Sequence, residues 1–123
     1  MNITYKNTVA FEDYNVLVEA VGWGTRNPKQ VRMALERSDF LISAQIDNKT
    51  IGMARVIQDG LQALVMDVIV LPEYQGRGIG KELMKYVMEY LSRDGGIFVN
   101  LMSAQGREGF YEQFGKDWEG LVQ

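Results

Sequence analysis

The chain has 123 residues, of which 46% are hydrophobic and 24% are charged, and its formal net charge is −3 at pH 7. These values are typical of a soluble globular protein with one hydrophobic core, so we expect a single domain over residues 1–123. The acidic balance excludes a broadly basic nucleic-acid-binding surface, and no apolar run approaches the roughly 18 residues of a membrane span. We therefore expect neither nucleic acid nor a membrane as a partner. The N-terminal residues do not resemble a signal peptide, which predicts a cytoplasmic protein.

The sequence contains no cysteine and no histidine. The absence of cysteine excludes a disulfide, a thiolate nucleophile and a Cys-based metal site. The absence of histidine removes the commonest general base and the commonest zinc ligand. We therefore expect no metal site, and any acid–base chemistry must use Asp, Glu, Tyr, Lys or water.

The N-terminal third of the chain predicts one strand and two helices. Residues 2–7 alternate, as a strand does, and the apolar pattern of residues 11–20 predicts a helix with an acidic first turn. Asn27 is a suitable N-cap for a second helix, and Pro28 suits its first turn. This helix is expected to end near Arg37.

Three further apolar segments predict consecutive strands joined by hairpin turns. They cover residues 40–46, 50–58 and 61–71. A patterned helix follows the third strand, then a short buried strand at residues 97–102 and a short helix at residues 108–114. The hairpins imply antiparallel pairing, and the strand–helix–strand crossover implies one parallel pair. We predict an α/β fold with a mixed, partly antiparallel sheet flanked by helices.

A glycine-rich loop, Gln75-Gly76-Arg77-Gly78-Ile79-Gly80, joins the third of these strands to the helix. Such a loop places backbone N–H groups at a helix N-terminus, which makes an anion site suited to a phosphate or pyrophosphate. The Walker A pattern fails because Glu82 follows Lys81, and the Rossmann pattern fails because the third glycine comes one residue early. A nucleotide-binding protein of another fold is therefore disfavoured. A plain glycine-rich turn is the remaining alternative, although three closely spaced glycines cost backbone entropy.

This loop and the strand before it resemble the acetyl-CoA loop of the GNAT N-acetyltransferases. Gln75-x-x-Gly78-x-Gly80 is similar to that family's [RQ]-x-x-G-x-[GA] pattern, and it follows the strand ending VIVLPEY at Tyr74. The segments VGW near residue 22 and RVIQDG near residue 58 also resemble a subgroup of small bacterial GNAT proteins. The resemblance implies the GNAT fold, here with a short C-terminus after Gly115.

The resemblance also implies where acetyl-CoA would bind as the co-substrate. Loop amides would hold the CoA pyrophosphate, from Gly76, Gly78, Ile79, Gly80 and Lys81. The side chains beside it would be those of Gln75 and Arg77. The pantetheine arm would pair like an added strand with the backbone of Val68, Ile69 and Val70. The family's splay between this strand and residues 97–102 would leave a gap for the thioester.

The segment FYEQFG that ends at Gly115 resembles the family's [FL]-Y-x-x-x-G segment. By this match Tyr111 would be the acid that protonates the leaving sulfur, and a tyrosine pKa near 10 suits a donor at neutral pH. The alternative is that Tyr111 is an amphipathic core residue. Direct attack by an amine needs no acyl-enzyme, so it is compatible with a chain without Cys and His. A backbone N–H near Ile69 or Val70 would polarise the thioester carbonyl.

The general base is a separate question, for which Asp67 is the candidate. Strand alternation places it on the same face as Ile69, and a carboxylate in an apolar strand is costly unless it is paired or functional. Its role is therefore either that of the base or that of an ion-pair partner, for example of Arg55 on the neighbouring strand. A water chain is the third possibility.

These expectations together describe an N-acetyltransferase that moves the acetyl group of acetyl-CoA directly onto a primary amine of a small molecule or peptide. The alternative is a CoA-binding GNAT-like regulatory module without turnover. Trp23, between two glycines, is expected either to wall the amine pocket or to pack in the core. Because the segment after Gly115 is short for two further strands, we expect the acceptor site either to be open or to be completed by a second copy in a homodimer.

Overall fold

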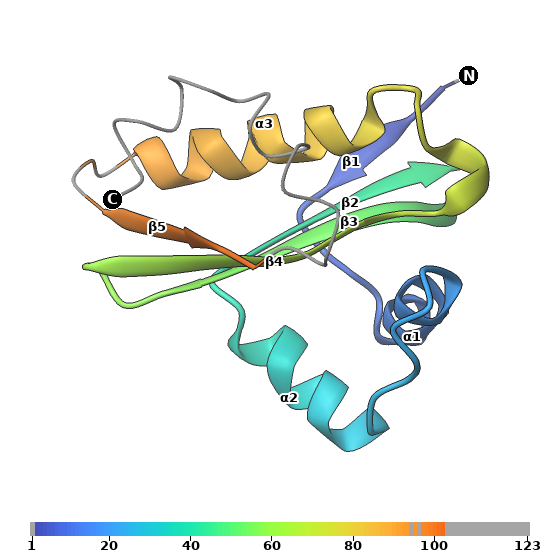
Figure 1. The fold of residues 1–123 in the computed structure, drawn as a ribbon, viewed down its shortest axis with the longest axis horizontal. Coiled ribbons are helices and arrows are strands. Elements are labelled where there is room, and N and C mark those ends of the chain that lie inside the picture. Colours follow the sequence, from blue (N-terminus) through green and yellow to red (C-terminus); the bar gives the residue numbers. More distant parts are fainter. Residues whose placement is uncertain (1, 94, 96, 103–123) are drawn as a thin grey trace.

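A five-stranded sheet with helices on both faces forms the structure, a computed structural model that describes residues 2–93, 95 and 97–102 (Figure 1). The strands lie side by side in chain order: β1 (Thr4–Lys6), β2 (Phe40–Ile46), β3 (Lys49–Gln58), β4 (Gln62–Val70) and β5 (Phe98–Leu101). Neighbouring strands are antiparallel except β4 and β5, which are parallel. The predicted mixed sheet is therefore confirmed. The helix expected at residues 108–114 lies outside the described residues.

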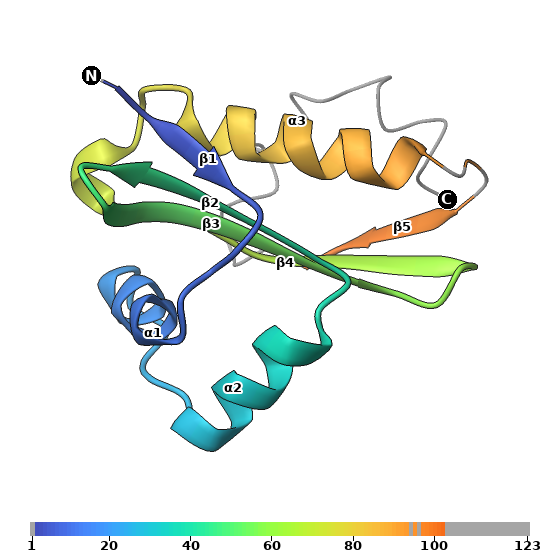
Figure 2. The ribbon, with the colours of Figure 1, turned by 180° about the vertical axis from the view of Figure 1, so that it is seen from behind.

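In the described part of the chain, three α-helices cover the sheet, one on one face and two on the other. Figures 1 and 2 show α3 (Ile79–Ser92) on one side and α1 (Phe11–Ala20) and α2 (Pro28–Arg37) on the other. The predicted start of α2 is confirmed, since the Asn27 side chain accepts hydrogen bonds from the amides of Lys29 and Gln30. Within the described part of the chain, no helix has the length and apolar character needed to cross a membrane.

The core is divided between the two faces of the sheet. The buried side chains of α3 recur at helical spacing, and they are Ile79, Leu83, Met84, Val87 and Leu91. On the opposite face α1 buries Tyr14, Leu17 and Val18. Burial of a face this apolar holds α3 in one position on the sheet, which places its N-terminus beside the end of β4.

Helix α3 packs closely on β3 at Gly52. A Cβ added at this position would lie 3.1 Å from the carbonyl oxygen of Ile69 and 3.2 Å from Cδ1 of Leu83. Both distances are shorter than ordinary van der Waals contact, so this close approach of α3 and β4 to β3 favours a glycine.

Replacing Gly52 with alanine is therefore expected to lower the free energy of unfolding by about 1–3 kcal/mol, because the added methyl group overpacks the site. Urea unfolding of the two proteins measures this difference. In the double variant Gly52→Ala with Leu83→Val, we expect the loss of unfolding free energy to be smaller than the sum of the two single losses. The second change removes Cδ1 of Leu83, one of the two atoms that the added methyl group would meet. An unchanged unfolding midpoint in Gly52→Ala would contradict the prediction.

Strand β4 is interrupted at Asp67. The register with β3 shifts there, so that two residues of β4, Asp67 and Val68, oppose the single residue Ala54. Asp67 has a φ of 55°, in the left-handed region. This is a β-bulge, which bends the strand that carries it. The strand predicted over residues 61–71 is confirmed as β4, but the bulge within it was not predicted, because a bulge depends on pairing with β3.

Strand β5 pairs with only the first half of β4. The paired residues run from Gln62 opposite Phe98 to Val65 opposite Leu101, and the Met102 amide donates to the Val65 carbonyl at 3.0 Å. Pairing among the described residues therefore stops just before the bulge. Among residues 2–93, 95 and 97–102, no strand pairs with the outer edge of β4 after the bulge. The splay of the two strands stays a prediction.

Candidate functional site

The loop between β4 and α3 presents backbone amides that the helix does not use. A 3₁₀ turn (η1, Pro72–Tyr74) leaves the strand, and the amide of Glu82 makes the first hydrogen bond of α3, 3.0 Å from the Gly78 carbonyl. The amides of residues 79–81 precede that bond, and no side chain caps this end of the helix. Together with the helix dipole, these amides make the loop a candidate anion site.

The two loop glycines Gly76 and Gly78 both have positive φ, at 80° and 82°. Residues with a Cβ rarely adopt this conformation, which explains glycine at both positions. A Cβ added at either would meet nothing within 4 Å, so the loop is open on its outer side. A ligand can therefore approach the backbone of this loop.

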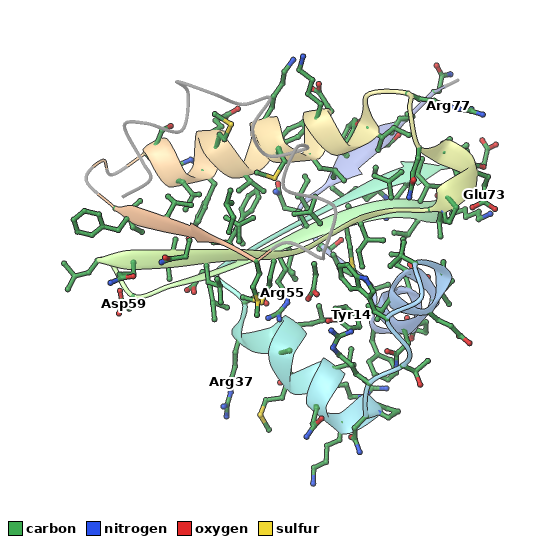
Figure 3. All side chains as sticks on the ribbon, in the orientation of Figure 1. Tyr14, Arg37, Arg55, Asp59, Glu73 and Arg77 are labelled. Carbon is green, nitrogen blue, oxygen red and sulfur yellow. The ribbon has the colours of Figure 1, made fainter. Side chains whose placement is uncertain are left out.

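Positively charged side chains lie beside the loop. The Arg77 guanidinium carbon is 5.5 Å from the ring centroid of Tyr74, and Lys49 Nζ is 5.8 Å from the same centroid. Figure 3 shows Arg77 at the turn into α3, above Glu73 on the 3₁₀ turn. These cations add to the positive potential of the helix N-terminus, so they favour a multiply charged anion.

The edge of β4 next to this loop is available for pairing. The Leu71 amide donates to the Ile51 carbonyl of β3 at 2.8 Å, so strand alternation turns Ile69 toward β3 and Val68 and Val70 toward the outer edge. At that edge the Gln75 side chain donates to the Val70 carbonyl at 2.9 Å. This hydrogen bond connects the loop to the strand edge. The loop predicted to hold the pyrophosphate and the edge predicted to pair with pantetheine are therefore adjacent.

A buried polar network lies at the bulge, between the sheet and helices α1 and α2. Oδ2 of Asp67 accepts from the Tyr14 hydroxyl at 2.8 Å and from Arg55 Nε at 3.0 Å. The Arg55 guanidinium also donates to Ser38 Oγ at 3.3 Å and to the Met66 sulfur at 2.8 Å. Figure 3 shows Tyr14 reaching from α1 toward the face of the sheet that carries Arg55. The ion pair between Asp67 and Arg55 is confirmed, and the role of Asp67 as a base stays a prediction.

A family model describing an acetyltransferase (GNAT) domain matches residues 37–115, well over half of the chain. The chain belongs to the GNAT acetyltransferase family. Among curated relatives, the uncharacterised N-acetyltransferase ycf52-like protein of Prochlorococcus marinus is 39% identical over 104 residues, 80% of this chain and 58% of its own length. The ycf52 protein of Pyropia yezoensis is 31% identical over 112 residues, 85% of this chain and 64% of its own length. This chain thus spans less than two thirds of the length of these relatives.

Solved structures of GNAT proteins share the fold. A probable acetyltransferase from Staphylococcus aureus superposes with a TM-score of 0.87 at 25% identity, covering 93% of this chain and 89% of its own. A GNAT-family acetyltransferase from Streptococcus pneumoniae has a TM-score of 0.76 at 31% identity, and the match covers 93% of this chain and 85% of the other. The expected GNAT fold is therefore confirmed.

Two other candidate site residues of this GNAT domain, Trp23 and Tyr111, are not part of the loop or of the β4 edge. Trp23 lies in the loop between α1 and α2 with 38% of its surface exposed, so it is not a core residue. Its role in an amine pocket stays a prediction. Tyr111 lies outside the described residues, and its role as the acid also stays a prediction.

Two members of the polar network were not predicted from the sequence. Tyr14 is 53 residues from Asp67 in the chain, and it occupied a position that fits the apolar face of a helix. Ser38 follows the end of α2, where its hydroxyl donates to the Ala34 carbonyl at 2.7 Å. The available signal was the charged pair Arg55 and Asp67 within apolar strands, which requires polar neighbours.

Burial raises the pKa of Tyr14 to about 12, and the Asp67 carboxylate with its hydrogen bond acts in the same direction, against smaller opposite effects of Arg26 and Arg55. The folded protein thus holds this proton more tightly than the unfolded chain, in which the pKa is about 10. The resulting stability is fully present below about pH 10 and is lost as the pH rises to about 12.

We therefore expect the free energy of unfolding to fall between pH 10 and pH 12 by on the order of 2 kcal/mol more in the unmodified protein than in Tyr14→Phe, which has no proton to lose. Denaturant unfolding at a series of pH values measures how steeply the unfolding free energy of each protein falls with pH. Equal slopes for the two proteins would contradict the prediction.

Proposed function

We propose that this GNAT domain is an N-acetyltransferase that transfers the acetyl group of acetyl-CoA to a primary amine of a small molecule or peptide. The observation that supports it best is the junction of β4 and α3. There, in the part of the chain that the structure describes, a helix N-terminus without a side-chain cap lies directly beside a strand edge that β5 does not pair with. The helix N-terminus suits a pyrophosphate, and the strand edge suits an extended pantetheine arm with its amide groups.

Binding of acetyl-CoA would use the chain's own backbone at both ends. The amides of residues 76 and 78–81 would receive the pyrophosphate, with Gln75 and Arg77 beside it. The outward backbone groups of Val68 would pair with a pantetheine amide, as in an added β-strand, because the Val70 carbonyl already accepts a hydrogen bond from Gln75. Since Ile69 is turned toward β3, the amide of Val70 is the better placed donor to the thioester carbonyl.

The transfer would be a direct displacement. The amine nitrogen forms a bond to the acetyl carbon while the C–S bond breaks, and the nitrogen loses a proton. The leaving thiolate takes a proton, for which we propose Tyr111 as the donor. We assign the amine proton to water, because the Asp67 carboxylate is already paired with Arg55 and bonded by Tyr14.

Release of free thiol from acetyl-CoA tests the proposal, measured across a panel of small-molecule amines, both cationic and anionic, and of peptides with free α-amino or lysine groups. We expect thiol release that depends on the added amine and a matching acetylated product by mass spectrometry. Binding of CoA with no thiol release on any amine would instead support a regulatory CoA-binding module.

A further inference from the structure

The buried network of Tyr14, Arg55 and Asp67 is not used by the chemistry proposed above. Asp67 has only 8% and Arg55 only 14% of the side-chain surface exposed, and Tyr14 is 2% exposed. Removing a carboxylate and a guanidinium from water is costly, so a pair of this kind requires a compensating role in structure or function.

The network acts on one point of the backbone. Asp67 is the bulge residue with positive φ, and aspartate adopts this conformation more readily than most other residues with a Cβ. Its carboxylate is held from two directions, by α1 through Tyr14 and by β3 through Arg55. Arg55 is in turn hydrogen-bonded to Ser38, at the end of α2. The bulge is therefore tied to both helices on this face of the sheet.

The bulge lies next to the edge of β4 that is predicted to bind pantetheine. Within the described residues, pairing of β4 with β5 ends at Val65, and the bulge of Asp67 and Val68 lies just beyond this point. A bulge bends its strand, and the angle of that bend decides where Val68 and Val70 point. Any group that holds the bulge thus also holds the edge at which the thioester would lie.

We infer that Arg55 and Tyr14 are positioning residues that act through Asp67 to orient the pantetheine-binding edge of β4, while Asp67 itself is a structural carboxylate and not the base. This inference rests on the proposed use of acetyl-CoA. A misplacement of about 1 Å at a reacting centre can cost on the order of 100-fold in rate, so the network would affect turnover without touching the substrate.

The test compares the affinities of CoA and of 3′-phospho-ADP, which carries the pyrophosphate but lacks the pantetheine arm. Calorimetry on Arg55→Met is expected to show an unchanged affinity for 3′-phospho-ADP and a roughly tenfold weaker affinity for CoA, the loss expected for about one backbone hydrogen bond. Arg55→Lys, which keeps the charge, should recover part of the loss. Where Arg55→Met does not fold, Tyr14→Phe is the test variant, with a smaller expected loss.

Two control variants separate positioning from other effects. Arg77→Gln, which removes the guanidinium beside the anion site, should weaken both ligands equally and leave their affinity ratio unchanged. Arg37→Met removes an arginine that Figure 3 shows on α2, pointing away from the sheet, and should change neither affinity. An unchanged ratio of affinities in folded Arg55→Met and Tyr14→Phe would overturn the inference. An unmodified protein that binds neither ligand would overturn the proposed function as well.

Asp67→Asn separates the positioning role from that of a base. Asparagine tolerates a positive φ and still accepts a hydrogen bond from Tyr14, so we expect a reduced kcat with an unchanged shape of the pH–rate profile. Loss of the acidic limb of that profile, with CoA affinity unchanged, would overturn the inference and identify Asp67 as the base.

Discussion

Replacing Gly80 with proline is expected to weaken acetyl-CoA binding by about 10- to 100-fold, which corresponds to the loss of one hydrogen bond to a charged group. Gly80 is the second residue of α3, and its amide precedes the first hydrogen bond of the helix. Proline in the first turn therefore removes an amide that the ligand needs and the helix does not. Isothermal titration with acetyl-CoA measures the effect.

Gly80→Ala is the matched control, because it also adds a Cβ but keeps the amide. We expect its affinity to stay close to that of the unmodified protein. Proline also restricts the residue before it, so thermal unfolding must show that both variants fold. Equal affinities in folded Gly80→Pro and Gly80→Ala would contradict a role for this amide in holding the pyrophosphate.

Replacing Tyr111 with phenylalanine is expected to lower kcat by about 10²- to 10⁴-fold, the usual contribution of a positioned general acid. The variant removes only the hydroxyl, so acetyl-CoA should bind with unchanged affinity. The rate of the unmodified enzyme should fall as the pH rises toward the ordinary tyrosine pKa of about 10, and the variant should lose this dependence. Steady-state thiol release over a range of pH measures both effects.

Tyr86→Phe is a suitable control for this experiment, because Tyr86 is a partly exposed residue of α3 whose ring lies 5.2 Å from that of Tyr5, at the N-terminal edge strand. We expect it to keep its activity. Full activity in Tyr111→Phe would show that the leaving thiolate takes its proton from water or from another group.

The element boundaries were predicted well where the signals are local. Residues 11–20 and 40–46 form the helix and the strand that were expected there, and α2 begins at Pro28 after its Asn27 cap. A cap, a proline or a helical apolar period acts within one or two turns, so the sequence alone is sufficient to locate it. The 3₁₀ turn of residues 72–74 was not predicted, since a proline after a strand is compatible with several turns.

In the candidate site too, the features with local sequence signals were predicted, and those that depend on distant segments were not. The loop part of the candidate site was predictable because one short segment contains both the glycines and the amides that would bind an anion. The ion pair of Arg55 with Asp67 was one of two alternatives for this carboxylate, and the observed register of β3 and β4 is what brings the two side chains together. Tyr14 could not be predicted, since its hydroxyl reaches a carboxylate 53 residues away.

The sequence by itself determined the strand–loop–helix unit around residues 75–80, its capacity to hold an anion and its likeness to the GNAT family. These properties follow from glycine, which permits positive φ, and from the apolar period of the following helix. Only the tertiary structure showed that β4 bulges at Asp67, just after its described pairing with β5 ends, and that a buried network holds the bend. Such a bend arises from pairing and packing between distant segments, so no local pattern encodes it.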